Sequence, residues 1–162
     1  MLKQTEVNCY YLGKTYPLFT RVDSSINKVS INFDGESFIC VSPNSGSIDI
    51  SEDFKKFYIK ECKKLISERL KLYQPNIKVK YKSFSIENEK NKWGSCNSSK
   101  HLTFNWKLIL FPIEAIDYVV VHELCHLMHM NHDRSFWRLV GKIQPQYKEA
   151  MAILGSTKTR DI

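Results

Sequence analysis

The chain has 162 residues, which is enough for one domain with a substantial hydrophobic core. Hydrophobic residues make up 43% of the sequence and aromatic residues 12%, and this content excludes a disordered chain. The formal net charge of +7 would suit an acidic partner or substrate, but a lysine-rich, solvated surface accounts for it slightly better.

Cysteine usage and apolar runs bear on the location of the protein. The five cysteines are widely spaced and form no C-x-x-C pair, so a structural zinc knuckle is not expected. The N-terminus lacks the apolar segment of a signal peptide, and no apolar run approaches the ~20 residues that a membrane-spanning helix needs. These features predict a cytoplasmic protein with reduced thiols and no membrane partner.

Short alternating stretches near the N-terminus predict a small sheet. Four strands are expected, at residues 8–12, 15–21, 29–33 and 38–41. Asp34 and Gly35 lie between the last two strands and are a strong hairpin signal. We therefore expect residues 1–45 to form an N-terminal antiparallel β-hairpin module that packs on the main domain, and residues 43–47 to act as a linker.

The next segment predicts a helix and two strands. Ser51 is expected to cap the helix, and Pro75 is expected to end it. Alternating apolar residues predict a strand at 77–82, with lysines on its outer face, and a second strand at 101–110. The residues between them, 91–99, are rich in turn formers and predict a loop.

A buried helix with polar residues follows. Pro112 opens it, and its apolar residues point in nearly all directions as far as Met130. Yet it carries His122, Glu123 and His126 in an H-E-x-x-H pattern. Histidines four residues apart share a helix face and can bind one zinc ion, and the glutamate can accept a proton from water. Because unpaired buried polar groups are costly, a bound metal best explains all three side chains.

A catalytic zinc takes three protein ligands, and the third has several candidates. His132 lies ten residues after His122, as in a longer zinc-binding motif, but His129 stands where that motif has glycine. Asn131 is expected to make the turn instead, since asparagine tolerates the left-handed conformation. We favour His132, with Glu149 and His129 itself as the alternatives.

Two more helices are predicted towards the C-terminus. Asp133 can cap the first, and Pro145 starts the second, which Gly155 ends. The main domain is therefore expected to span residues 46–155, and residues 156–162 form a polar tail.

Five signatures in the second half of the chain occur in a fixed order. They are residues 92–96 (KWGSC), 105–109 (NWKLI), 117–126 (DYVVVHELCH), 131–132 with 136–137 (NH and FW), and 145–148 (PQYK). Together they resemble the YgjP-like metallopeptidase family, a group of predicted metal-dependent hydrolases. The resemblance is close over residues 80–155.

The resemblance implies an α+β fold with a zincin-like metallopeptidase domain. It implies one zinc ion on His122, His126 and His132, with Glu123 as the catalytic carboxylate, and so it also favours His132 as third ligand. Lys92 departs from the family pattern, which usually has arginine before the tryptophan, and a bidentate contact made by that arginine would be weakened.

Residues and resemblance together predict a zinc-dependent hydrolase, with a peptide as the leading substrate and Glu123 as general base. Side chains of the preceding strand and loop are expected to line the substrate site: Trp93, Ser95, Thr103, Asn105 and Lys107. The oxyanion has three candidate donors, Tyr118, Tyr147 and Lys107.

Two alternatives remain open at this point. A nucleotide phosphoanhydride is the alternative substrate, because the net charge and Lys78, Lys80 and Lys82 would suit an anion. A zinc-stabilised nucleic-acid-binding module is the second alternative, but Glu123 disfavours it, since a structural zinc has four protein ligands and needs no base. Ni²⁺ and Co²⁺ also suit imidazole ligands.

Overall fold

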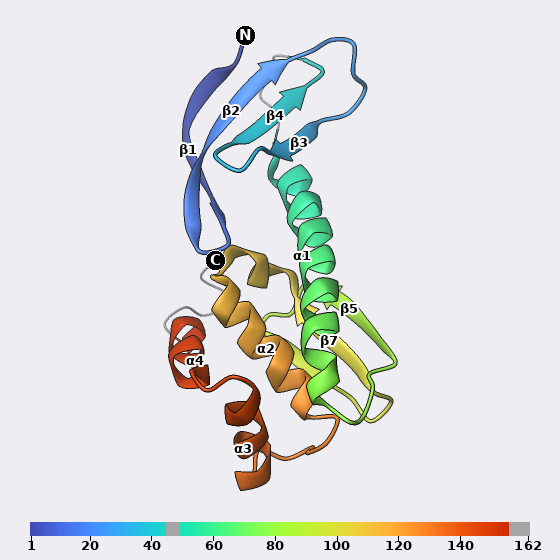
Figure 1. Ribbon diagram of the computed structural model, residues 1–162. Coiled ribbons are helices and arrows are strands. Elements are labelled where there is room, and N and C mark those ends of the chain that lie inside the picture. The colour runs from blue at the N-terminus through green and yellow to red at the C-terminus, as the bar shows by residue number, and fades with distance from the viewer. Residues whose placement is uncertain (45–48, 156–162) are drawn as a thin grey trace.

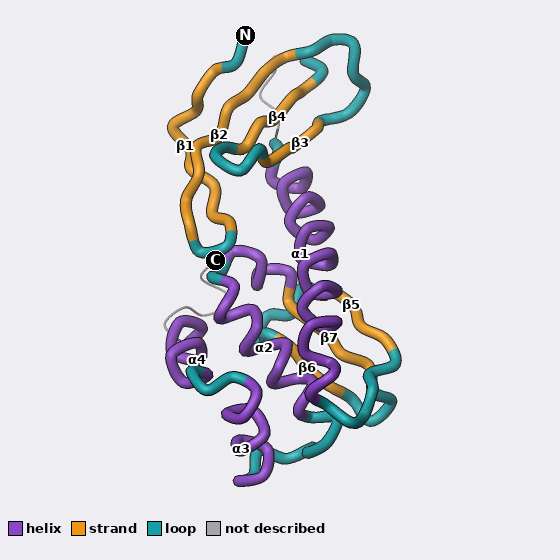
Figure 2. The backbone as a smooth tube through the Cα atoms, viewed as in Figure 1, coloured by secondary structure: helices purple, strands orange, loops and turns teal. Residues whose placement is uncertain are grey.

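The computed structural model describes residues 1–44 and 49–155 and shows an elongated α+β molecule (Figure 1). A four-stranded sheet forms one end, and a three-stranded sheet lies with the shorter helices at the other. The long helix α1 (Ser51–Tyr73) runs between the two ends and contacts both sheets, as the path of the backbone in Figure 2 shows.

The N-terminal sheet contains the four predicted strands, arranged as two hairpins. Its strands are β1 (Lys3–Tyr11), β2 (Lys14–Val22), β3 (Ser30–Phe33) and β4 (Phe38–Ser42), in the order β1-β2-β4-β3. Each hairpin is antiparallel, but β2 and β4 pair in parallel, so the sheet as a whole is mixed. This difference from an all-antiparallel module arises because alternation predicts strands and faces, not which edges pair.

The tip of the first hairpin is attached to the other half of the molecule. Leu12 and Gly13 have positive φ angles of 49° and 82°, and their backbone N–H groups donate to the carbonyls of Ile109 and Leu110 at 2.9 Å. A Cβ atom on Gly13 would lie 2.6 Å from Cγ of Pro112. Glycine therefore permits both the turn and the close approach.

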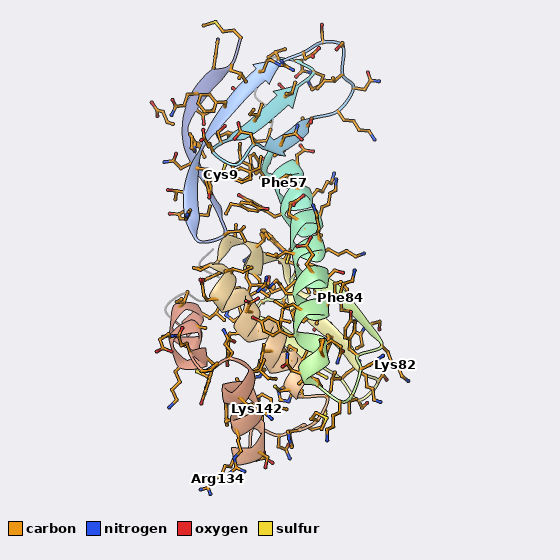
Figure 3. The ribbon with its side chains drawn as sticks, in the orientation of Figure 1. Cys9, Phe57, Lys82, Phe84, Arg134 and Lys142 are labelled. Atoms are coloured by element: carbon orange, nitrogen blue, oxygen red, sulfur yellow. The ribbon has the colours of Figure 1, made fainter. Side chains whose placement is uncertain are left out.

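Aromatic rings fill the junction between α1 and the N-terminal sheet. Phe38 is fully buried, and its ring lies 4.8 to 5.8 Å from those of four neighbours, Tyr11, Phe33, Phe54 and Phe57. Figure 3 shows Phe57 on α1 beside the sheet, with Cys9 on β1 across the junction. The sheet and the helix thus share one core.

Helix α1 includes Ser51 as its first residue, so the predicted cap at Ser51 is wrong: the N-cap residue is Ile50, which makes no side-chain capping bond. The carboxylate of Asp49, just before it, accepts hydrogen bonds through Oδ1 from the backbone N–H of Ser51 at 3.0 Å and from the Ser51 hydroxyl at 2.6 Å. Pro75 ends the helix as predicted and lies in a short 3-10 helix, η1 (Gln74–Asn76). The linker (43–47) falls partly, and the polar tail (156–162) wholly, outside the described residues, so the domain division stays a prediction.

The second sheet differs from its prediction in both main strands. It contains β5 (Ser83–Glu87), β6 (Gly94–Cys96) and β7 (His101–Asn105), in the order β5-β7-β6. The strand predicted at 77–82 is wrong, because the side chain of Gln74 takes up its backbone groups. That amide donates to the carbonyls of Ile77 and Val79 at 3.3 and 3.2 Å and accepts from the N–H of Tyr81 at 3.2 Å.

The second predicted strand, 101–110, is correct only in its first half. The side chain of Asn105 accepts a hydrogen bond from the backbone N–H of Lys107 at 3.0 Å and so caps a 3-10 helix, η2 (Trp106–Leu110). Asparagine commonly competes in this way with regular backbone pairing. Leu108 and Ile109 of η2 are buried, and Trp106 and Leu110 pack against the core, so the apolar residues that suggested a strand are used in a 3-10 helix instead.

Helix α2 (Ile113–Cys125) is the centre of the second half of the molecule. It packs against α1, the second sheet, α3 (Arg134–Ile143) and α4 (Tyr147–Gly155), and ten of its residues are buried. The predicted end at Met130 is wrong, because tighter turns follow Cys125: the N–H groups of Leu127 and Met128 each donate to a carbonyl three residues back. None of the described helices combines the length and the apolar content that crossing a membrane requires.

Candidate metal centre

Three histidine nitrogens converge on one point beside α2. The Nε2 atoms of His122 and His126 lie 3.2 Å apart, and that of His132 lies 3.1 Å from the first and 3.0 Å from the second. Nitrogen ligands at 2.0–2.1 Å around a tetrahedral zinc are about 3.3 Å apart, so the triangle fits such an ion closely. When all three imidazoles are neutral and carry their protons on Nδ1, three Nε2 lone pairs face one another, and a shared cation would relieve their repulsion.

His132 reaches the cluster because helix α2 ends at Cys125, before the end that the sequence predicted. After Cys125 two tight turns bring His129 beside the cluster, where its backbone carbonyl lies 3.0 Å from Nδ1 of His126. The next residues carry His132 back over the end of α2. The predicted left-handed conformation at Asn131 is wrong, because its φ angle is not positive. The chain reverses direction without a left-handed residue here, because the helix already ends at Cys125.

The other two candidates for third ligand lie outside the cluster. Of the described residues, only His122, His126 and His132 form a group of ligand atoms close enough to share one ion. Glu149 is in the first turn of α4, and His129 contributes its carbonyl rather than its ring.

A hydrogen bond at Nδ1, the ring nitrogen that faces away from the cluster, orients both His122 and His126. Nδ1 of His122 lies 3.2 Å from the hydroxyl oxygen of Tyr118, and Nδ1 of His126 faces the carbonyl of His129. With Nε2 turned to the shared point, Nδ1 carries the proton and donates it in both bonds. The i to i+4 spacing of Tyr118 and His122 was a signal in the sequence for this contact.

Aromatic packing fixes the imidazole rings in place. Phe136 on α3 is fully buried, and its ring lies 4.6 to 4.9 Å from those of all three histidines. Trp137 stacks on His132 at 5.9 Å, and Tyr147 stacks on Trp137 at 5.5 Å. Asp133 holds this helix as predicted, since its carboxylate accepts from the N–H of Phe136 at 2.9 Å.

The electrostatic setting keeps the ligands neutral. Burial, together with the smaller effects of the nearby His126 and His132, lowers the pKa of His122 to about 3. Burial also lowers the pKa of His126. Neutral imidazole is the form that binds a metal, so the site is ready to accept one at neutral pH.

Glu123 lies beside the cluster with little exposure to solvent. It is 5% exposed, and burial raises its pKa to about 8, while the Lys92 ammonium acts in the opposite direction. A Cβ atom on Gly94 of β6 would lie 3.0 Å from both Cγ and Oε1 of Glu123. Glycine in the KWGSC segment is thus what lets the edge strand approach the carboxylate, and a nearby divalent cation would favour its ionised form.

Of the predicted substrate-binding residues, Trp93 lines the cavity beside the cluster, whereas Ser95, Asn105 and Lys107 do not. This cavity also borders His122 and Glu123. Ser95 instead shares a hydrogen bond with the hydroxyl of Thr103.

Asn105 and Lys107 do not border this cavity. Asn105 is fully buried, and its amide donates to the carbonyls of Glu89 and Lys92 at 2.8 and 3.1 Å, which fixes the loop ahead of Trp93. Lys107 belongs to η2.

The fold is α+β and zincin-like, and a buried helix that carries converging histidines and an adjacent glutamate is typical of metal-dependent hydrolases. The chain belongs to the YgjP-like family: the family model described as "YgjP-like, metallopeptidase domain" matches residues 2–157.

The chain is similar to the crystal structure of the metallopeptidase zymogen of Pyrococcus abyssi abylysin, with 23% identity and a TM-score of 0.49. The similarity covers 52% of this chain and 87% of that one. No sequence among the curated proteins matches the chain.

Proposed function

We propose that the protein is a zinc-dependent peptidase in which His122, His126 and His132 hold the ion and Glu123 is the general base. The observation that carries the proposal is the meeting of three Nε2 atoms within 3.2 Å of one another, next to a buried carboxylate at the edge of a cavity. A single zinc per chain and a cytoplasmic location belong to the same proposal.

The residues of the chain divide the work of peptide hydrolysis. When bound, zinc would make a water molecule more acidic and polarise the carbonyl of the scissile bond. Glu123 accepts the proton of the attacking water and passes it to the leaving amine. Its burial suits this role, because a carboxyl with a pKa near neutrality can both accept and return a proton.

A peptide is the substrate class that the surroundings of Glu123 favour. Strand β6 is at the edge of its sheet and pairs only with β7 among the described strands. Gly94 places this edge against Glu123. An extended peptide can add to such an edge through main-chain hydrogen bonds, which presents its amide bonds to the site.

A nucleotide substrate finds less support. The described residues around the cavity include one cation, Lys92, and mainly apolar side chains otherwise. Lys80, one of the lysines that prompted this alternative, borders a separate hollow with Lys71 and Pro75. Besides the proposed metal, a triphosphate would therefore meet a single cationic side chain in exchange for its hydration. The non-catalytic alternative leaves the buried Glu123 without a role.

The first test concerns the metal. Elemental analysis of gently purified protein should show about one zinc per chain, because three histidines are the usual number of protein ligands of one catalytic zinc. His132→Ala should lose most of it, and Glu149→Ala, the matched control, should keep it. The opposite pattern would make Glu149 the third ligand.

The second test concerns the chemistry. A peptide library and a panel of nucleoside triphosphates should be incubated with wild type and with Glu123→Gln. We expect peptide cleavage that falls at least ~10²-fold in the variant, the typical contribution of a positioned base, while zinc content stays the same. Nucleotide hydrolysis without peptide cleavage would overturn the proposal in favour of the phosphoanhydride alternative, and full activity of Glu123→Gln would eliminate the mechanism.

A further inference from the structure

A cavity of about 390 Å³ opens beside the proposed reacting centre. His122 and Glu123 form part of its lining, so whatever occupies it lies next to the attacked bond. Its volume is within the range of small-molecule and side-chain pockets, about 300–1,000 Å³. The cavity therefore has the position and size of a specificity pocket.

The walls of this cavity are apolar and come from three separate parts of the chain. Val119 of α2 and Leu154 of α4 are 3% and 5% exposed and form fixed surfaces, while Met151 of α4 is 36% exposed. The Trp93 ring packs against Phe111 with its centroid 4.9 Å away, in an edge-on contact.

The backbone also anchors this part of the cavity. The carbonyl of Trp93 accepts a hydrogen bond from the N–H of Asn105 at 2.9 Å. Together with the packed Trp93 ring, this bond means that the pocket exists before any substrate arrives, which lowers the entropy cost of binding.

One cation borders this apolar space. Lys92 lines the cavity, is exposed, and is close enough to Glu123 to act on it electrostatically. Its ammonium would repel a lysine or arginine side chain that entered the same space. The pocket thus discriminates by charge as well as by hydrophobicity.

We propose that this cavity binds the side chain of the substrate residue next to the scissile bond, and that it selects large apolar side chains over small or cationic ones. This inference rests on the proposed peptidase function and adds the substrate class. Helix α4 acts as the specificity element, because Met151 and Leu154 form the wall opposite α2.

The test uses a direct binding measurement that needs no turnover. Titration calorimetry on zinc-loaded protein should compare acetohydroxamate with phenylacetohydroxamate, two zinc-binding probes that differ by a phenyl ring. We expect the phenyl-bearing probe to bind at least about tenfold more tightly, since even one methylene in an apolar pocket changes selection by about that factor. Equal affinities in the wild type, or no binding of either probe, would overturn the inference.

Variants on α4 then locate the effect. Met151→Trp should fill the cavity and abolish the advantage of the phenyl ring. Ile153→Trp is the matched control: it lies on the same helix with 37% exposure, against 36% for Met151, and does not line the cavity. If Met151→Trp keeps its circular dichroism spectrum and still binds the phenyl-bearing probe more tightly, α4 does not form a wall of the pocket.

A peptide arm separates this inference from the proposed function. Sequencing of library cleavage products should show Leu, Met and Phe enriched at one position flanking the cleaved bond, with Lys and Arg depleted. Cleavage with no such preference contradicts the pocket and leaves the peptidase intact. No cleavage, together with a phenyl-dependent hydroxamate affinity, contradicts the peptidase and leaves the pocket.

Discussion

At the scale of single residues, the hydroxyl of Tyr118 contacts His122, one of the three proposed metal ligands. Tyr118 is 8% exposed, and burial raises its pKa to about 12, so its hydroxyl stays neutral and can accept the proton of Nδ1. Such outer contacts set the tautomer and the direction of a metal-binding imidazole.

Removal of this hydroxyl should weaken metal binding without changing the fold. We expect Tyr118→Phe to lower zinc affinity by about 10-fold to 100-fold, since the N–H of His122 loses its acceptor. Competition with a fluorescent chelator measures this, and excess zinc should restore activity. Tyr147→Phe is the control, because its described contact is ring stacking on Trp137, which it would keep. Equal affinity in the two variants would show that Tyr118 does not orient the ligand.

The residues of the site were predictable where they are close in sequence. His122, Glu123 and His126 lie on one helical turn, and His132 follows at a recognisable spacing. Gly94 was missed as a partner of Glu123, and so were the walls that α4 contributes, because tertiary packing alone brings them there. Asn105 was predicted to face substrate, yet its amide is used by backbone groups in the interior.

At the scale of elements, an ion pair fastens α1 to α2. Arg69 donates from Nε and Nη2 to the two carboxylate oxygens of Asp117 at 2.6 and 2.7 Å, and the hydroxyl of Tyr73 donates to the same carboxylate at 2.8 Å. The Asp117 side chain is 9% exposed, so three interactions meet at a nearly buried group five residues before His122.

Neutralising this carboxylate should lower stability. We expect Asp117→Asn to reduce the free energy of unfolding by about 1.5–3 kcal/mol, the usual range for hydrogen bonds to charged groups. Urea denaturation measures this change. Asp23→Asn tests the exposed pair with Arg21, where solvent screens the interaction, and should change the midpoint little. If both variants behave alike, the ion pair does not hold α1 on α2.

The elements themselves were predictable in kind but not always in extent. Helices α1, α3 and α4 and the two N-terminal hairpins follow from periodicity, turns and caps. The two long strands were misplaced because polar side chains, of Gln74 and Asn105, replaced the backbone partners that a strand needs. The periodicity of apolar residues does not show when a polar side chain competes for the backbone groups of a strand.

At the scale of the whole molecule, the hairpin tip joins the N-terminal sheet to the half that carries the site. Leu12 and Gly13 donate hydrogen bonds to the segment just before α2, and Gly13 leaves no room for a Cβ atom beside Pro112 at the start of that helix. The two halves also share the aromatic core around Phe38. We therefore expect them to unfold as one cooperative unit.

A pair of glycine variants can isolate the docking contact. Gly13→Ala and Gly35→Ala both place a side chain at positive φ, 82° and 100°, but only the first meets a neighbour, Pro112. We expect Gly13→Ala to lower Tm more than Gly35→Ala. In Gly13→Ala the near-UV circular dichroism signals of both halves should be lost in a single transition. Equal shifts in the two variants would mean that the tip contributes only its own turn.

The position of the three proposed ligands along the chain has a practical consequence for preparing the protein. His122, His126 and His132 fall within eleven successive residues, and His126 lies six residues before His132. Closing so short a loop costs little entropy, so even an incompletely folded chain can capture zinc. The cavity, in contrast, needs Trp93, Val119 and Leu154 from three distant segments. A preparation can thus carry its full complement of zinc and still lack a formed active site, and the binding of an apolar probe is the better measure of a properly assembled enzyme.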